Sequence, residues 1–386
     1  MTTEDVEGPR LATADDFPGI LDLVDRCFSH PDGGMLAHWC HVYDIEQPER
    51  HAVVCADGEV VSHISIVEDE LVIGDDTITC WGFTGVGTDP RYRGRGFMSD
   101  ILDLLVERMA DHEIPLAKLG GDRIRYGRWG WERGGPERRY RITDRYLDVG
   151  DGENLTLHRY QESADEIDLF DRLYREKRYR VQRDREHWRT VLNRQQFTTL
   201  YTDAPGTTAY AVFTRGRENR RRSTVTEMAG DEAGLRAILH HIVTVFGNNT
   251  ISVRAHPSDP LNAFLAKPDV CGSWDTGTNR SLRLNCLPDV ITAYQSEMTQ
   301  SCRAYPVESS SATLAIEEDD DPITVEWDGE DVTVERTDAS PDIRLDRMAM
   351  TRLLFWDGRT VDGYDRHPLV EAITPLQYWA PKLDQV

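Results

Sequence analysis

The chain has 386 residues and a formal net charge of −24, with 68 acidic against 44 basic residues. A surface this acidic repels a phosphate backbone, which excludes nucleic acid as an expected partner. Only four of the basic residues are lysines. An acidic, lysine-poor composition predicts a halophilic origin, because high salt screens the repulsion between like charges.

The sequence contains no sign of a membrane span, a disulfide framework or a metal site. The first residues carry no apolar stretch, and nowhere do about 18 apolar residues follow one another. We therefore expect a cytoplasmic protein that does not bind a membrane. The seven cysteines are widely spaced and include no C-x-x-C pair, so we expect neither a disulfide framework nor a bound metal.

The first 150 residues predict an α/β arrangement. Apolar side chains at a spacing of three and four indicate helices, β-rich runs indicate strands, and Asp57-Gly58 is a strong hairpin turn. A glycine-rich loop lies at a junction between strand and helix. The expected elements are a helix at 13–30, a hairpin at 52–67, strands at 71–73, 77–87, 115–119 and 138–142, and a helix at 97–113.

Two further regions follow a linker-like stretch at 149–156. Residues 165–265 repeat the style of the first region more weakly, and Ala229-Gly230-Asp231 stands in place of the glycine-rich loop. From about residue 285, short strands and a helix near 347–355 indicate a third part. The second region is expected to contain helices at 167–180, through Trp188 and at 233–246, strands near 200 and at 210–214, 224–228 and 250–255, and a solvated hairpin loop at Arg220–Arg222.

The segment Val86–Met98 carries the strongest chemical signal. A strand runs into a loop with two glycines, and an amphipathic helix begins at once. Such a loop presents backbone N–H groups and a helix N-terminus, which together bind a pyrophosphate. A Cβ would block the close approach of phosphate oxygens. The residues expected to bind the ligand are Val86, Gly87, Thr88, Arg91, Arg93, Gly94, Arg95, Gly96, Phe97 and Met98.

The spacing in this loop excludes two common phosphate-binding motifs. No G-K-[ST] sequence is present, and Ser99 stands where a dinucleotide fingerprint has its third glycine. What remains is R-x-x-G-x-G, formed by Arg91, Gly94 and Gly96. This pattern resembles the acyl-CoA loop of the GNAT superfamily of N-acetyltransferases, and the resemblance implies acetyl-CoA as the co-substrate.

A second motif, Y-G-R-W-G-W at residues 126–131, follows the next predicted strand. It resembles the S-E-x-x-I-Y-G-R-F-G-Y signature of the enhanced intracellular survival (Eis-like) acetyltransferases. Three residues depart from this signature: Gly121 replaces Ser, Asp122 replaces Glu, and Arg125 replaces an apolar residue. The resemblance extends over the whole chain.

The Eis-like resemblance implies an α/β fold class with tandem GNAT folds, each a mixed central sheet flanked by helices, and a C-terminal α+β domain like a sterol-carrier protein. The catalytic GNAT domain is expected at residues 1–150, a degenerate second GNAT domain at 151–285, and the C-terminal domain at 286–386. Members of the family commonly form hexamers, so a homo-oligomer is expected.

The resemblance also implies catalytic roles. Tyr126 is expected to protonate the departing thiolate, because a phenol has a pKa of about 10. Backbone N–H groups near Val86 and Thr88 are expected to polarise the thioester carbonyl on a splayed strand. The carboxylate of Val386 is the family-derived base, although the usual terminal aromatic residue is missing. The alternatives are catalysis by solvent or a water relayed by His38, His41, His63 or Asp25.

The acceptor amine is expected to enter a cleft with aromatic walls, since aromatic faces and carboxylates attract a cation. Each aromatic residue is equally compatible with an ordinary position in the core. The expected pocket residues, on elements that line the amine side in GNAT proteins, are Asp25, Phe28, Trp39, Trp81 and Phe83.

Two functions of different classes remain open. The first is an acetyl-CoA-dependent N-acetyltransferase that acts by direct attack on a primary amine of a polyamine-like or aminoglycoside-like small molecule, or of lysine. The second is a non-catalytic acyl-CoA sensor, which needs the phosphate loop but neither Tyr126 nor a base. A lipid carrier acting through the C-terminal part is a third alternative. The single phosphate loop predicts one CoA per chain.

Overall fold

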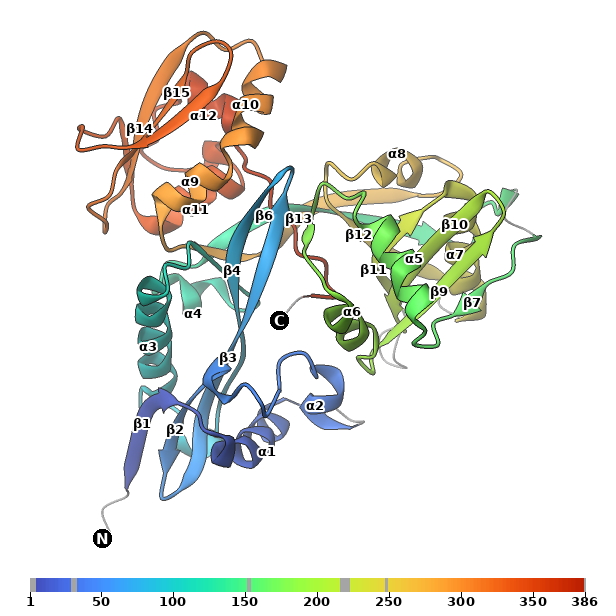
Figure 1. The fold of residues 1–386 in the computed structure, drawn as a ribbon, viewed down its shortest axis with the longest axis horizontal. Helices are drawn as coiled ribbons and strands as arrows, with labels where there is room; N and C mark the ends of the chain where they lie inside the picture. The colour runs from blue at the N-terminus through green and yellow to red at the C-terminus, as the bar shows by residue number, and fades with distance from the viewer. Residues whose placement is uncertain (1–4, 29–32, 151–153, 216–222, 247–248, 385–386) are drawn as a thin grey trace. The chain divides into compact units, whose positions relative to one another are not determined.

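A computed structural model describes residues 5–28, 33–150, 154–215, 223–246 and 249–384 (Figure 1). These residues fall into two compact units, each assembled from separate stretches of the chain. The first unit lies within Met1–Gly135 and Arg280–Gln377, and the second within Pro136–Asn279 and Tyr378–Gln385. The predicted loop at Arg220–Arg222 and the predicted base Val386 lie outside the described residues.

The first unit contains a sheet in the order β1-β2-β3-β4-β5, followed by the end of β13. β4 and β5 pair in parallel and the other neighbours pair antiparallel, so the sheet is mixed. The predicted hairpin at Asp57-Gly58 is confirmed, and both turn residues have positive φ. The strands are β1 Val6–Leu11, β2 His51–Ala56, β3 Glu59–Ile73, β4 Asp76–Thr88, β5 Leu116–Leu119 and β13 Ser273–Leu284.

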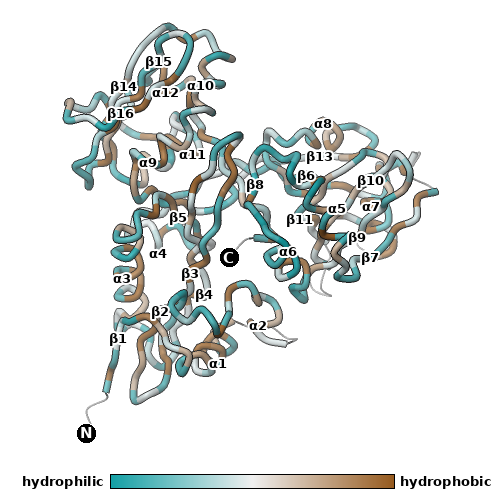
Figure 2. Tube along the Cα trace, viewed as in Figure 1, coloured by the Kyte–Doolittle hydropathy of each residue, from teal (hydrophilic) through white to brown (hydrophobic). Residues whose placement is uncertain are grey.

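Helices cover both faces of this sheet. Val53 and Cys55 of β2 pack in one apolar cluster with α1, whereas Ala52 and Val54 pack in another with α3, because neighbouring strand residues point to opposite faces. Hydrophilic and hydrophobic segments alternate along α3 (Figure 2), as the sequence pattern predicts. The helices are α1 Phe17–Cys27, α2 Gly34–His38, α3 Phe97–Asp111 and α4 Arg123–Gly127.

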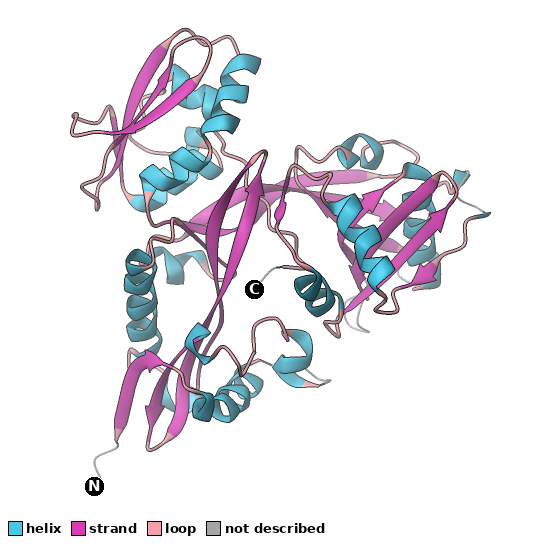
Figure 3. Ribbon diagram, viewed as in Figure 1, coloured by secondary structure: helices cyan, strands magenta, loops and turns pink. Residues whose placement is uncertain are grey.

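The later stretch of the first unit adds a four-stranded sheet in the order β16-β15-β14-β17 (Figure 3). β14 and β17 are parallel, and the other pairs are antiparallel. Helices α9 and α10 had no counterpart in the sequence prediction. The elements are α9 Leu287–Ala293, α10 Gln295–Ala304, β14 Ser310–Ile316, β15 Ile323–Trp327, β16 Val332–Arg336, β17 Ile343–Leu345, α11 Arg347–Phe355 and α12 Pro368–Ile373.

The second unit has a mixed sheet in the order β6-β12-β11-β10-β9-β7, with β11 and β12 parallel. Helix α7 packs on β10 and β11. The predicted helix 167–180 is too long, since α5 ends at Tyr174 and a short strand follows. The elements are β6 Glu132–Thr143, β7 His158–Arg159, α5 Ala164–Tyr174, β8 Tyr179–Val181, α6 Arg185–Leu192, β9 Phe197–Ala204, β10 Thr207–Thr214, β11 Ser223–Gly230, α7 Glu232–Val245, β12 Thr250–Ala255 and α8 Leu261–Leu265.

Candidate functional site

The end of β4 has an open backbone edge. β5 pairs with β4 from Cys80 to Phe83 and ends at Leu119, so Thr84–Thr88 have no ladder partner on that side among the residues that the structure describes. The pairing of β4 with β3 shifts register opposite Gly85, whose φ is +60°. A Cβ at Gly85 would lie 2.6 Å from the Tyr43 hydroxyl. The resulting bulge turns the backbone of β4 at Val86, where the sequence predicts a splayed strand.

The loop after β4 is shaped by its own side chains. Asp89 accepts the backbone N–H of Arg91 and pairs with the Arg91 guanidinium at 3.0 Å, while Arg93 donates to the Thr88 carbonyl at 3.2 Å. These contacts hold two of the three loop arginines against the loop itself. The Arg95 guanidinium lies 4.8 Å from the centre of the Tyr92 ring.

The two glycines of this loop keep space free in front of α3. Gly94 has φ +80°, and a Cβ there would have no heavy atom within 4 Å. Gly96 has φ +92° and is the N-cap of α3, and a Cβ there would lie 3.8 Å from a carboxylate oxygen of Asp100. The loop therefore combines glycine backbone with a helix N-terminus, the features on which the predicted phosphate-binding loop depends.

Tyr126 lies on the short helix α4, whose N-cap Asp122 accepts the backbone N–H of Arg125. Its ring packs against Gly121, where a Cβ would approach Tyr126 Cε2 to 2.4 Å. A side chain at position 121 would therefore collide with the Tyr126 ring as it is placed here. Burial raises the pKa of Tyr126, so the phenol keeps its proton at neutral pH.

Tyr126 belongs to an apolar cluster that also includes three predicted ligand-binding residues, Val86, Phe97 and Met98. These residues therefore pack on the side of the sheet that α3 covers.

The five predicted pocket residues do not form one group. Trp81 and Phe83 are buried in the apolar cluster on the α3 side of the sheet, with Trp81 donating to Glu68 and Phe83 packed edge-on against Trp131. Phe28 and Trp39 are partly buried and pack on the other cluster, beside α1. Trp81 and Phe83 lie on β4 and point to the α3 side, whereas Phe28 and Trp39 follow the ends of α1 and α2, which pack on the other side. The sequence pattern alone did not predict on which face of the sheet each residue lies.

The predicted acidic residue and two of the predicted histidines lie near the short helix α2. Asp25 accepts the backbone N–H of Met35 at 2.6 Å, which makes it a cap for this helix. His38 is buried, with Nδ1 at 3.0 Å from the Gly34 carbonyl oxygen, and His41 stacks on Trp39. Local capping thus accounts for the position of Asp25.

His63 lies under the bulge of β4 in a buried polar cluster that the sequence did not predict. Its Nδ1 is 2.9 Å from the Gly85 carbonyl oxygen and its Nε2 is 3.0 Å from His51 Nδ1, which is 2.7 Å from Ser65 Oγ. Burial lowers the pKa of His51 to about 4 and that of His63 to about 3, so both rings are neutral at pH 7. The cluster fixes the carbonyl of the bulge.

The second unit repeats the strand pair without the loop. β11 pairs with β12 from Ser223 to Val225, and its register on β10 then shifts near Thr226, as β4 shifts on β3. β11 ends at Gly230 and α7 begins two residues later. A Cβ at Gly230 would lie 2.2 Å from the Thr208 carbonyl oxygen, so this glycine serves a close backbone contact.

The C-terminal segment, residues 378–384, lies at this second strand pair. Trp379 and Pro381 line a cavity of only about 10 Å³ together with residues from the ends of β11 and β12. The C-terminal segment therefore leaves only a small cavity beside the ends of β11 and β12.

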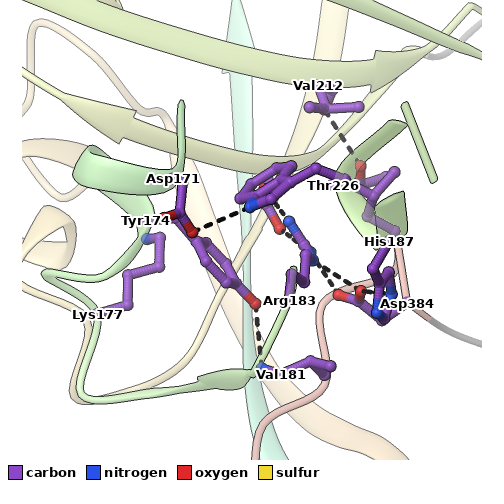
Figure 4. Close-up of polar contacts among 12 residues, drawn as sticks. Asp171, Tyr174, Lys177, Val181, Arg183, His187, Val212, Thr226 and Asp384 are labelled. Atoms are coloured by element: carbon purple, nitrogen blue, oxygen red, sulfur yellow. Dashed lines mark hydrogen bonds and ion pairs between the residues drawn. The ribbon is translucent and has the colours of Figure 1, made fainter. Parts of the chain in front are cut away.

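Arg183 anchors the C-terminal segment (Figure 4). Its guanidinium is fully buried, donates to Asp384 at 2.8 Å and to Glu227 at 2.6 Å, and lies 4.2 Å from the centres of the Tyr174 and Trp188 rings. Burial alone would raise the pKa of Asp384, but the charge of Arg183 outweighs it and lowers the value. No local sequence pattern indicates this contact, because its partners are 201 positions apart.

Among the described residues, no cluster of three or more His, Cys, Asp or Glu side chains is arranged to hold a metal ion. Within the same residues, no helix has both the length and the apolar content needed to cross a bilayer.

Both strand pairs lie in regions that match known families. Residues 9–134 match a family described as an acetyltransferase (GNAT) domain, and residues 180–284 match a second family of the same description. None of the curated proteins matches the chain.

Solved structures resemble the chain over its full length. A GCN5-related N-acetyltransferase from Kribbella flavida has a TM-score of 0.72 at 18% identity, and one from Anabaena variabilis has 0.73 at 14%. Eis1 from Mycobacterium abscessus has a TM-score of 0.64 at 14% sequence identity. In all three comparisons 100% of both chains is covered. At these identities the likeness establishes a shared fold, with two GNAT domains in a mixed α/β arrangement.

Proposed function

We propose that this chain, an acyltransferase of the GNAT superfamily, transfers the acetyl group of acetyl-CoA to the primary amine of a small molecule or of lysine. The observation that carries the proposal is the open edge Thr84–Thr88 of β4, which leads into Gly94 and Gly96 and shares an apolar cluster with Tyr126. This combination supports binding of the thioester beside a group that can protonate the leaving thiolate.

The proposed reaction is a direct transfer. The neutral amine attacks the thioester carbonyl, a C–N bond forms, and the C–S bond breaks. Backbone N–H groups at the open edge near Val86 and Thr88 stabilise the oxyanion, and the departing thiolate takes the phenolic proton of Tyr126. The proton lost by the amine goes to a base, for which the carboxylate of Val386 remains the prediction. His63 is a poor alternative, since its pKa of about 3 makes it a weak proton acceptor.

The test is a CoA-release assay with acetyl-CoA and a panel of polyamines, aminoglycosides and lysine peptides. Tyr126→Phe is expected to lower kcat by roughly 10²–10⁴-fold while leaving the Kd for acetyl-CoA within about twofold, because the hydroxyl acts on the leaving group. Acetyl-CoA binding without release on any amine would support the sensor alternative instead. An unchanged kcat in the variant would remove Tyr126 from the mechanism.

Finer assignments extend the proposal. The motif at residues 126–131 and the fold shared with Eis1 support membership of the Eis-like group. The α+β arrangement of α9–α12 and β14–β17 supports a sterol-carrier-like domain at 286–386. Acceptor identity, a cytoplasmic location and a hexameric assembly stay predictions, and light scattering of the purified protein tests the last of these.

A further inference from the structure

A cavity of about 700 Å³ lies within the first unit, where the segment Gly127–Gly130 meets the start of α11. This volume is in the range of small-molecule sites. Helix α3 contributes Val106 to its lining, which is about 14 Å along the helix from Phe97 at a rise of about 1.5 Å per residue. The cavity is therefore distinct from the phosphate loop.

Two glycines of the Y-G-R-W-G motif shape this cavity. A Cβ at Gly127 would lie 3.0 Å from Met348 Cε, and one at Gly130 would lie 2.5 Å from Arg347 Cδ. Gly130 also has φ +86°. These two glycines of the motif let the first turn of α11 approach the segment after α4.

The floor of the cavity contains two buried arginines. Arg283 is 7% exposed and Arg347 is 8% exposed. Arg347 forms an ion pair with Asp319 at 2.5 Å. Arg283 donates to the Trp129 carbonyl and to Asn285, both at 2.7 Å, and within the described chain it has no carboxylate at ion-pair distance.

The charge on Arg283 is poorly compensated. Burial and the neighbouring Arg347 lower the pKa of its guanidinium to about 10, against the opposing effect of Asp319 and Glu318. A buried cation without a counter-ion is costly, and an anion in the cavity would remove that cost.

The other arginines of the lining divide into paired and unpaired. Arg123 and Arg352 both bind the buried carboxylate of Glu132. Arg128 is exposed, lies 4.7 Å from the centre of the Trp129 ring, and forms no ion pair with any described residue. Two guanidinium groups, those of Arg128 and Arg283, thus line one cavity with donors available in a chain of net charge −24.

We propose that this cavity binds a phosphate ester that also carries hydroxyl groups, with its phosphate against Arg283 and Arg128. Guanidinium groups bind phosphate oxygens through paired hydrogen bonds. The carboxylates of Glu318 and Asp362 are exposed on the same lining and accept hydrogen bonds from hydroxyl groups. The mixed lining therefore favours a sugar phosphate or nucleotide over inorganic phosphate.

The phosphate ester has two chemical sources, the 3′-phosphorylated ribose of CoA itself or a separate metabolite. Acetyl-CoA and its 3′-dephospho form are the probes that test CoA as the source. Ribose 5-phosphate and ribose are the probes that test a separate metabolite. Calorimetry on the full chain measures the Kd of each, without any need for turnover. Failure of the proposed acetyl transfer leaves this test intact.

Ribose 5-phosphate is expected to bind the wild-type protein more tightly than ribose does. The variants Arg283→Gln and Arg128→Gln are each expected to raise the Kd for ribose 5-phosphate by about tenfold or more. If instead these variants weaken the binding of acetyl-CoA but not that of its 3′-dephospho form, the phosphate that the cavity binds is the 3′-phosphate of CoA. Arg303→Gln is the control, since Arg303 is an exposed arginine that pairs with Asp331 outside the cavity.

Two features keep the test decisive. Arg128 is exposed and makes no ion pair, so Arg128→Gln reports on binding even where Arg283→Gln fails to fold. The proposal is overturned if neither ribose 5-phosphate nor the 3′-phosphate of CoA depends on either arginine.

Discussion

The two parallel strand pairs, β4–β5 in the first unit and β11–β12 in the second, share their local backbone arrangement. They differ in the residues that follow and surround the strands. Each pair parts after a few residues, beside a register shift on the preceding strand. Eight residues separate β4 from α3, and among them Gly94 has no heavy atom within 4 Å of its Cβ position. One residue separates β11 from α7, and Trp379 and Pro381 of the C-terminal segment lie beside the ends of β11 and β12.

The second pair lacks the loop that is proposed to bind a pyrophosphate in the first, and side chains of the C-terminal segment lie at the ends of its strands. Buried polar groups of the second unit, Arg183, Glu227 and Asp384, then satisfy one another. The expected stoichiometry of one CoA per chain follows from this difference.

The strongest way to break the comparison is to remove the anchor. Arg183→Met leaves the buried carboxylates of Glu227 and Asp384 without their cation, so the free energy of unfolding is expected to fall by about 3–5 kcal/mol. Urea denaturation measures this change. Arg185→Met is the matched control, because the exposed pair of Arg185 with Asp168 contributes about 0–1 kcal/mol. Equal losses in the two variants would contradict the assignment.

Acid is expected to weaken the first unit through Glu132. Burial would raise its pKa, but hydrogen bonds from Arg123 and Arg352 outweigh burial and lower it from 4.5 to about 2. A lowered carboxyl pKa contributes stability above pH 4.5, and this contribution is lost as the pH falls from 4.5 to 2, by up to about 3 kcal/mol. Glu132→Gln should flatten the pH dependence of unfolding in this window; an identical slope would exclude Glu132 as its cause.

Substitution at the loop glycine sharpens the comparison at the level of binding. Gly94 and Gly206 share φ +80° and open surroundings, so alanine costs each about the same backbone strain. Gly94→Ala is expected to weaken the binding of acetyl-CoA by about tenfold, or about 1.4 kcal/mol, because the added Cβ would block the approach of a phosphate oxygen. Gly206→Ala should leave the Kd unchanged. Calorimetry measures the Kd for acetyl-CoA in both variants. Equal affinities would mean that the phosphate does not bind at this loop.

The smallest expected effect concerns salt. If the surface charge of −24 reflects adaptation to high salt, the Tm should rise by several degrees between 0.1 M and 2 M KCl, since screening removes repulsion between exposed charges. The loss caused by Arg183→Met should stay nearly constant over this range, because a buried pair is screened little. Thermal unfolding of both proteins gives the answer; a Tm that falls with added KCl would contradict the inference from composition.

Local sequence patterns predicted the first strand pair, but they did not predict that the C-terminal segment lies beside the second. The hairpin at Asp57-Gly58, α3 and the glycine loop are each encoded within a few neighbouring residues, so periodicity and turn chemistry were sufficient. The C-terminal segment has no such periodicity, and its partner Arg183 is distant in sequence. The face occupied by Trp81 depends on the register of β4, and the position of Phe28 depends on which face of the sheet α1 covers. Tertiary packing determines both.

Neither unit is a continuous piece of the chain, and this affects folding during synthesis. Arg183 is made 201 positions before Asp384, and Arg123 and Glu132 precede Arg352 by more than two hundred positions. A growing chain therefore carries incomplete cores for most of its elongation, with buried charges that still lack their partners. Expression of either GNAT region alone would keep it in that unfinished condition, so dissection of this protein at its apparent domain boundaries is expected to give aggregates and not folded halves.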